Sequence, residues 1–242
     1  ANMKSVIQTL LACAALLVCS SGMAQEALIR KNIAERLPLI KAVDEVRKTA
    51  IPGIYELRIN GSEIFYTDAQ ANYLIEGNII DVRAKRNLTE ERIAKLTEVK
   101  FDNLPLKDAF TIVRGNGKRR MAVFEDPNCG YCKHFERDLQ KVDNVTVYMF
   151  LYPILGADSG EKSKAIWCAK DQAKAWQDWM VRDQPIPAPV ANCDVSALTR
   201  NVELGRNHKI TGTPTLIFID GARVPGAVDA RQVEKMLTDA KG

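Results

Sequence analysis

One stretch of the chain restricts the possible folds more than any other. Met121 to Phe124 is a short apolar run, Gly130 to Val142 has helical periodicity, and Val145 to Tyr152 is rich in valine and aromatic residues. Two strands joined by a helix lie parallel, with a right-handed connection. The sequence therefore predicts a β-α-β unit that carries a Cys-x-x-Cys motif, Cys129 and Cys132, at the start of its helix.

The two cysteines occupy different positions on this helix. Cys132, Phe135 and Leu139 follow each other at spacings of three and four, so they share one face, which we expect to be buried. Cys129 lies at the helix tip, where unpaired amide groups and the helix dipole favour a thiolate. We therefore expect Cys129 to be the attacking sulfur of a thiol–disulfide exchange site and Cys132 the resolving one.

Two other interpretations of the pair were weighed. A zinc site would need a second pair of ligands, but Cys168 and Cys193 are far apart and neither histidine has a partner at a typical spacing, so no metal is expected. A purely structural disulfide is the second alternative, and the helix-tip position argues against it. Between the cysteines, Gly130 allows close approach of a substrate backbone and Tyr131 adds an apolar lip.

The N-terminal residues are typical of a secretory signal. Lys4 precedes the apolar run Leu10 to Val18, and small residues lead to Ala24, so we assign residues 1–24 to a signal peptide. The run is too short to span a bilayer, which needs about 20 residues. A lipid-anchored form is an alternative, since Leu10 to Cys13 loosely resembles a lipoprotein processing site, but it falls too early in the apolar run.

Four of the six cysteines remain after residue 24, and an even number in an exported protein indicates disulfide chemistry. Of the three possible pairings, the one that keeps the Cys-x-x-Cys pair intact joins Cys168 to Cys193 in a structural disulfide; a buried free Cys168 thiol is the alternative. The net charge is +4 and no basic stripe is present, so no nucleic-acid partner is expected.

Residues 25–87 are expected to form a small N-terminal domain. Ala27 to Leu37 is helical in pattern, and the runs from Ile54, Glu63 and Tyr73 indicate antiparallel strands, the first two joined by a tight turn at Asn60-Gly61. A domain of this size with a thin core often needs oligomerisation, so we expect a dimer. Residues 88–100 are expected to form a linker helix capped by Thr89.

The second domain is expected over residues 101–242. After the β-α-β unit come helical residues 159–182, a strand from Thr215 turned by Asp220-Gly221 into a hairpin, and a final helix capped by Asp229. This order resembles the thioredoxin plan, so the predicted fold class is α+β. The thioredoxin plan implies a cis proline facing the cysteines, here Pro214, with the Thr213 backbone binding substrate; a trans turn is the common state of such a bond.

Several further runs resemble the bacterial periplasmic disulfide isomerase family DsbC/DsbG. They cover nearly the whole chain after residue 24. The runs are Phe124 to Phe135, Ala165 to Asp171, Cys193 to Val195, Gly212 to Pro214 and Val224 to Gly226. Gly130-Tyr131 favours the isomerase type over DsbG, which usually carries proline-tyrosine at these two positions.

The resemblance implies a homodimer joined through a cystatin-like N-terminal sheet, with two thioredoxin-like domains that hold misfolded, disulfide-containing exported proteins. It also implies a periplasmic location, a membrane reductase of the DsbD type that keeps the pair reduced, a chaperone activity independent of the cysteines, and no cofactor. In thioredoxin a buried acid lies six residues before the first cysteine, where this chain has Val123. Glu125 and Asp126 are closer to the motif and are expected to be solvated loop carboxylates.

Rival functions remain for the same motif. A dithiol oxidase, or a DsbG-like reductase of oxidised single cysteines, would also carry the Cys-x-x-Cys and Thr-Pro pairs, and the redox state in the cell would separate these enzymes from an isomerase. A dimeric holdase would not need the cysteines at all. A purely structural role for both disulfides predicts no exchange with small thiols.

Overall fold

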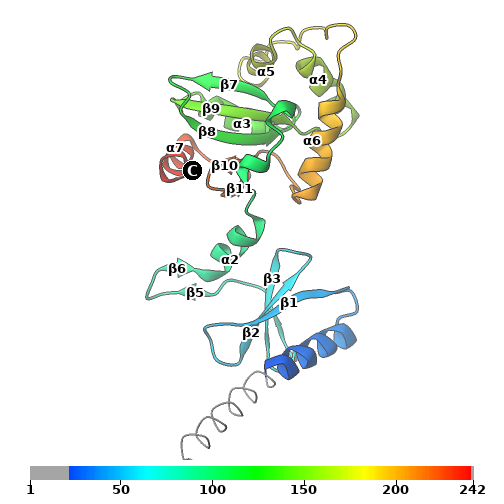
Figure 1. Ribbon diagram of the computed structural model, residues 1–242, viewed down its shortest axis with the longest axis vertical. Helices are drawn as coiled ribbons and strands as arrows, with labels where there is room; N and C mark the ends of the chain where they lie inside the picture. The colour runs from blue at the N-terminus through cyan, green and yellow to red at the C-terminus, as the bar shows by residue number, and fades with distance from the viewer. Residues whose placement is uncertain (1–21, 241–242) are drawn as a thin grey trace, which may run out of the picture. The chain divides into compact units, whose positions relative to one another are not determined.

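The computed structural model describes residues 22–240, so most of the expected signal peptide, residues 1–24, lies outside the described residues. The chain divides into two compact units, one ending at Leu96 and the other beginning at Thr97 (Figure 1). Each unit has its own hydrophobic core.

The N-terminal unit consists of a helix over residues 22–36 and a four-stranded antiparallel sheet. The sheet order is β1-β2-β3-β4. Its strands are β1 (Val43–Lys48), β2 (Ile54–Ile59), β3 (Glu63–Asp68) and β4 (Leu74–Ile75). Asn60 and Gly61 join β2 to β3 with φ of 52° and 87°, the two positive values that a tight hairpin turn requires. The predicted turn is confirmed, whereas β1 was not predicted.

The core of this unit lies between the helix and one face of the sheet. Ile29 and Ile33 of the helix pack with Leu57 and Ile59 of β2. The other face of β2 is also covered at Glu56, which is only 8% exposed. The Arg92 guanidinium donates to Glu56 at 3.0 Å, and this ion pair satisfies the carboxylate.

The run from Tyr73 to Val82 was predicted as one strand, and this was wrong. The structure has two two-residue strands in it, β4 and β5 (Ile80–Asp81), and β5 pairs with β6 (Arg86–Asn87). Gly77, with a φ of +156°, lies between β4 and β5. The large apolar side chains of this run are exposed, and none of them belongs to the core cluster of this unit.

The helix α2 (Leu88–Thr97) begins one residue before the predicted cap. Asn87, not Thr89, accepts from the first turn, through a 3.1 Å bond from the Glu90 amide. Thr89 is buried and its hydroxyl contacts the hydroxyl of Tyr66. Thr89 thus ties the helix to the sheet rather than capping it.

The C-terminal unit is built on a five-stranded mixed sheet of order β11-β10-β8-β9-β7. The strands are β7 (Phe110–Arg114), β8 (Arg119–Glu125), β9 (Val145–Leu151), β10 (Thr215–Phe218) and β11 (Arg223–Pro225). β8 and β9 are parallel, as the β-α-β pattern predicts, and all other neighbours are antiparallel. The predicted α+β class is confirmed; β7 was not predicted.

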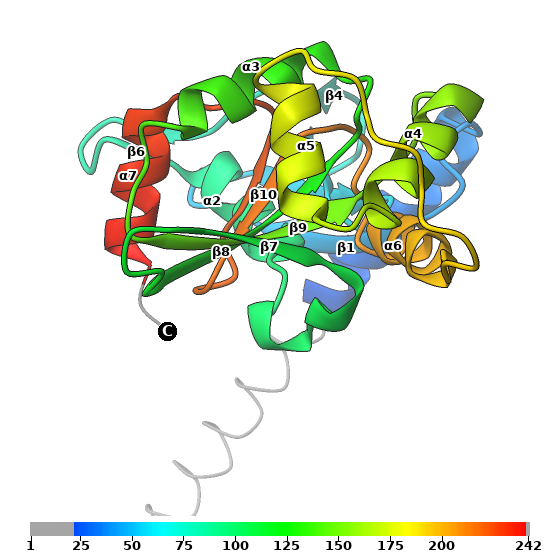
Figure 2. The same cartoon turned by 90° about the horizontal axis from the view of Figure 1, so that it is seen from above.

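Helices cover both faces of this sheet (Figure 2). α3, α5 and α7 pack on one face, while α6 and two short 3-10 helices, Phe101–Asn103 and Leu106–Asp108, contribute to the other. The helix bounds are α3 (Gly130–Leu139), α4 (Ala157–Trp167), α5 (Gln172–Met180), α6 (Ser196–Asn207) and α7 (Ala230–Asp239). The predicted helical stretch 159–182 is two helices, and α6 was not predicted.

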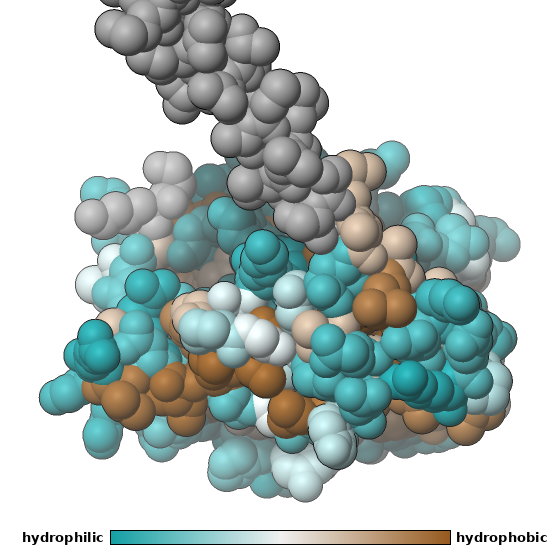
Figure 3. Space-filling view, turned by 90° about the horizontal axis from the view of Figure 1, so that it is seen from below, coloured by the Kyte–Doolittle hydropathy of each residue, from teal (hydrophilic) through white to brown (hydrophobic). Residues whose placement is uncertain are grey.

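The described residues contain no helix with the length and apolar character needed to cross a membrane. Viewed from below, the surface is mostly hydrophilic, with apolar side chains interspersed among the polar ones (Figure 3).

Candidate active site

Cys129 is the N-cap residue of α3. Its backbone is extended, with φ −77° and ψ 115°, and its Sγ accepts a hydrogen bond from the Cys132 amide at 3.3 Å. The sulfur therefore takes the place of the side-chain oxygen that caps most helices. Cys129 is 6% exposed, whereas Cys132, one turn into the helix, is fully buried.

The two thiols differ in acidity for physical reasons. A hydrogen bond from the Cys132 thiol, with further bonds from the Thr213 side chain and from the Tyr131 and Cys132 amides, lowers the pKa of Cys129 to about 6. Burial raises the pKa of Cys132 instead. A pKa one unit below neutrality leaves roughly ten thiolates for each thiol at pH 7, which makes Cys129 the candidate nucleophile of the pair.

The segment before β10 lies against Cys129. The Thr213-Pro214 peptide bond is cis, and the Thr213 carbonyl accepts from the Cys129 thiol at 3.3 Å. Pro214 is buried and Thr213 is half-buried. The structure thus brings together Cys129, Cys132, Thr213 and Pro214, residues more than eighty positions apart in the chain.

The two residues between the cysteines face solvent. Gly130 is exposed, and Tyr131 is 74% exposed although it is a large aromatic residue. An exposed aromatic side chain beside a reactive sulfur is suited to contact apolar parts of a substrate. His134 is exposed on the same helix.

The prediction for Glu125 and Asp126 was wrong, because both are fully buried rather than solvated. The Asp126 carboxylate accepts from the Ile154 and Leu155 amides, at 2.8 and 3.0 Å, and from the Ser159 hydroxyl at 2.7 Å. It fixes the loop after β9 next to the active-site loop. Burial, and then the charge of Glu136, raises the pKa of Glu125 well above its ordinary value.

Trp179 of α5 is part of the site and was not predicted. Its indole N–H donates to the Pro127 carbonyl at 2.7 Å, two residues before Cys129. The ammonium groups of Lys133 and Lys162 lie 4.2 and 4.7 Å from the centre of its ring. The sequence offered only a tryptophan in an amphipathic stretch, and nothing in it linked that residue to the motif.

Cys168, at the end of α4, forms a disulfide with Cys193. The bridge closes a segment with a sequence separation of 25 residues that contains α5. Cys129 and Cys132 are free thiols in the structure.

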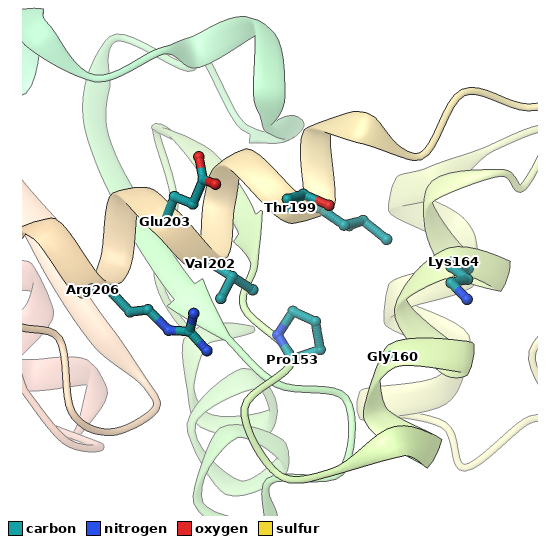
Figure 4. Close-up of a pocket in the computed structure, with 8 residues that line it drawn as sticks. Pro153, Gly160, Lys164, Thr199, Val202, Glu203 and Arg206 are labelled. Carbon is teal, nitrogen blue, oxygen red and sulfur yellow. The ribbon is translucent and has the colours of Figure 1, made fainter.

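A hollow of about 290 Å³ lies between Pro153, α4 and α6. Figure 4 shows the Arg206 and Val202 side chains extending toward Pro153, with Lys164 on α4. None of the predicted site residues lines it, so the cysteine site and this hollow are separate features.

Comparisons with known proteins bear on both units. A family described as the disulfide bond isomerase protein N-terminal domain matches residues 20–90, and one described as a thioredoxin-like domain matches residues 106–241. The probable thiol:disulfide interchange protein DsbC of Bordetella parapertussis is 48% identical over 195 residues, covering 81% of this chain and 68% of that protein. The chain belongs to the DsbC family.

Two further relatives are less identical to the chain than the Bordetella protein. The thiol:disulfide interchange protein DsbC of Escherichia coli K12 is 29% identical over 232 residues, 93% of each chain. A crystal structure of a disulfide interchange protein from Neisseria gonorrhoeae is 38% identical, with a TM-score of 0.52, covering 56% of this chain and 96% of that one. The resemblance to DsbC and the assignment as a thiol–disulfide oxidoreductase are confirmed.

Proposed function

We propose that this DsbC-family protein is a disulfide isomerase in which Cys129 attacks non-native disulfides of exported proteins. The observation that carries the proposal is the Cys129 sulfur itself, which caps α3 with a pKa of about 6 and lies 3.3 Å from the Thr213 carbonyl. A sulfur in this position is both a nucleophile near neutral pH and a good leaving group.

The exchange proceeds in two steps. The Cys129 thiolate attacks one sulfur of the substrate disulfide, forms a mixed disulfide and releases the other substrate sulfur as a thiolate. A different substrate thiolate then attacks the mixed disulfide and expels Cys129, so the substrate is rearranged without net oxidation. When no such thiol arrives, Cys132 displaces the substrate. Gly130, Tyr131, Thr213 and Pro214 would hold the substrate segment beside Cys129.

Two other functions fit parts of the same site. A DsbG-like reductase or a dithiol oxidase would use the same sulfur, and the exchange chemistry alone does not favour one of them over isomerisation. A holdase chaperone activity would rest on exposed apolar surface and would persist without Cys129. We propose chaperone activity as a second property of the protein, supported by the exposed apolar residues described below.

Reactivation of a scrambled multi-disulfide substrate in glutathione buffer tests the proposal. The reduced protein is expected to restore substrate activity, and the variant Cys129→Ser is expected to match the buffer alone. Exchange with glutathione but no reactivation would instead indicate an oxidase or a reductase. Suppression of substrate aggregation by Cys129→Ser, measured in parallel, reports the chaperone activity separately.

We place the protein in the periplasm, where its targets would be misfolded exported proteins and where a membrane reductase of the DsbD type would keep Cys129 and Cys132 reduced. The secretory signal pattern of the first residues and the disulfide between Cys168 and Cys193 support an oxidising compartment.

We also propose a homodimer formed through the N-terminal unit. The segment containing β4 and β5 exposes a group of large apolar side chains at the edge of the sheet, which supports an interface there. These are Tyr73 (72% exposed), Leu74 (40%), Ile75 (45%), Ile80 (57%) and Val82 (80%). Sedimentation of residues 25–242 is expected to give twice the chain mass, and a monomer over the whole concentration range would contradict the dimer.

A further inference from the structure

Beneath the two cysteines lies a buried cluster of ionisable side chains that the exchange mechanism above does not use. Glu125 ends β8 and Glu136 lies on α3, and both are fully buried. Their ionisations are coupled to each other, and that of Glu125 is also coupled to those of Cys132 and Cys129. Two buried carboxyl groups at close range cannot both be charged at low cost.

The backbone explains how this cluster forms. Val123 and Cys132 belong to the same core cluster, and Glu125, two residues after Val123 on the same strand, projects to the same face of the sheet. Glu136 follows Cys132 by four residues on α3, so these two side chains also share a face. Strand and helix therefore bring the Glu125 carboxyl group to the buried Cys132 thiol and the Glu136 carboxyl group to Glu125.

The two carboxyl groups have different surroundings. Glu136 accepts from the Trp176 indole N–H at 3.0 Å, and the charge of Arg114 also favours its ionised form. Among the described residues, the carboxyl oxygens of Glu125 accept from no amide, hydroxyl or cation, and the polar groups beside them are Glu136 and the Cys132 thiol. A buried carboxyl group without a donor that stabilises its charge calls for a functional explanation, because it costs stability. Burial raises the pKa of both groups, but only Glu136 has an indole N–H donor and a cation beside it, so Glu125 is the member of the pair that holds a proton more readily.

We propose that Glu125 is a catalytic residue that exchanges a proton with Cys132, while Glu136 positions that proton on Glu125. The inference rests on the proposed exchange at Cys129. In the mixed disulfide, the Glu125 carboxylate takes the proton from the Cys132 thiol. The Cys132 thiolate then attacks Cys129 Sγ, the Cys129–Cys132 disulfide forms, and the substrate sulfur leaves as a thiolate that takes a proton from water.

The charge of Cys129 sets the timing of this transfer. While Cys129 is a thiolate, burial, the charge of Glu136 and, to a smaller extent, the charge of Cys129 all raise the pKa of Glu125, which favours its protonated form. Formation of the mixed disulfide removes the Cys129 charge, so Glu125 ionises more readily at the step that needs a base. The reverse reaction, reduction of the pair by a dithiol, uses protonated Glu125 to supply the proton to Cys132 as its sulfur leaves.

The test follows a glutathione adduct in acid-quenched samples by mass spectrometry. Reduced protein is mixed with oxidised glutathione, and the rise of the Cys129 adduct reports attack while its decay reports resolution by Cys132. In Glu125→Gln, the rate of resolution near neutral pH is expected to fall about 100-fold, the lower end of what a positioned acid or base contributes. As the pH is raised above neutral, that rate is expected to rise about tenfold per pH unit, because hydroxide then removes the Cys132 proton. Adduct formation is expected to stay within about threefold of the parent rate.

The matched variant Glu136→Gln separates proton transfer from packing. It removes a charge that raises the pKa of Glu125. The resolution rate is therefore expected to reach its pH-independent value at a lower pH than in the parent protein, and that value is expected to be retained. Unchanged resolution in Glu125→Gln, with the parent pH profile, would overturn the relay while leaving the proposed function intact. A parent protein that forms no adduct at Cys129 would overturn the proposed function itself.

A second measurement covers the case in which Glu125→Gln does not fold. In the Cys132→Ser variant, formation of the glutathione adduct is expected to remove the infrared carbonyl band of a protonated carboxyl group, because Glu125 ionises when the Cys129 charge disappears. No change in that band on adduct formation would contradict the proposed timing.

Discussion

Phe135→Ala is expected to lower the free energy of unfolding by about 3–5 kcal/mol, the usual range for truncation of a buried aromatic side chain. Phe135 is 1% exposed and lies in the main core cluster of the C-terminal unit, on the same face of α3 as Cys132 and Leu139. The variant loses apolar contact and leaves a cavity that a close-packed core fills only in part. Denaturant unfolding of the C-terminal unit, followed by tryptophan fluorescence, measures the change.

Tyr131→Ala is the matched control, since it removes an aromatic side chain from the first turn of the same helix. Tyr131 is 74% exposed, and its removal is expected to change stability by less than about 0.5 kcal/mol. Equal losses in the two variants would show that helix formation, rather than burial of the α3 face, determines stability at this position.

The double variant Cys168→Ala/Cys193→Ala is expected to lose about 3 kcal/mol, because its unfolded chain regains the entropy of an open loop of this length. The bridge spans a sequence separation of 25 residues and encloses α5, whose Trp176 is buried in the main core cluster. Both versions are best compared in a Cys129→Ser background, so that exchange with the active thiol does not rearrange the bridge during unfolding.

The equilibrium midpoint and slope of this pair of proteins distinguish two origins of the effect. Because removal of the bridge makes the unfolded chain less compact, a lower midpoint with a steeper slope is expected. A lower midpoint at unchanged slope would instead indicate that the bridge acts on the folded state. No loss of stability would mean that residual structure around α5 already restricts this segment in the unfolded chain. The bridge would then not stabilise the fold in the way proposed.

The parts of the fold predicted from the sequence are those with strong local periodicity. The β-α-β unit, the hairpin at Asn60-Gly61 and the final helix capped by Asp229 were all predicted. In each of these, hydrophobic spacing and turn chemistry point to the same structure. The helix-tip position of Cys129 follows from the same spacing argument.

The elements that were missed depend on contacts distant in sequence. β1 alternates poorly and is paired only through β2, and α6 has a mixed polar pattern. The run from Tyr73 to Val82 has the composition of a strand, but it does not form one continuous strand. The chain is interrupted at Gly77, and the side chains of the run have little to pack against. Strand propensity is a property of the packed environment as much as of the residue, so composition alone could not divide this run.

The buried carboxylates were the main error at the site. Glu125 and Asp126 directly follow a buried strand and precede a proline, a context typical of a solvated loop. Asp126 is buried because the amides of Ile154 and Leu155, which follow another strand, replace water around it. Glu125 is buried because β8 continues through it in register with Leu151 of β9. Neither cause is local in sequence.

The disulfide between Cys168 and Cys193 gives this chain a second pair of sulfur atoms, which differs from the Cys129 and Cys132 pair in its susceptibility to reduction. Cys168 is 5% exposed at the end of a helix and lacks the activated helix-cap position of Cys129. Attack by an external thiolate depends on access to a sulfur and on the stability of the sulfur that leaves. When the Cys129–Cys132 pair has first been oxidised to a disulfide, a titration with a mild reductant should therefore consume two electrons per chain, all used to reduce that pair, while the Cys168–Cys193 bridge stays intact.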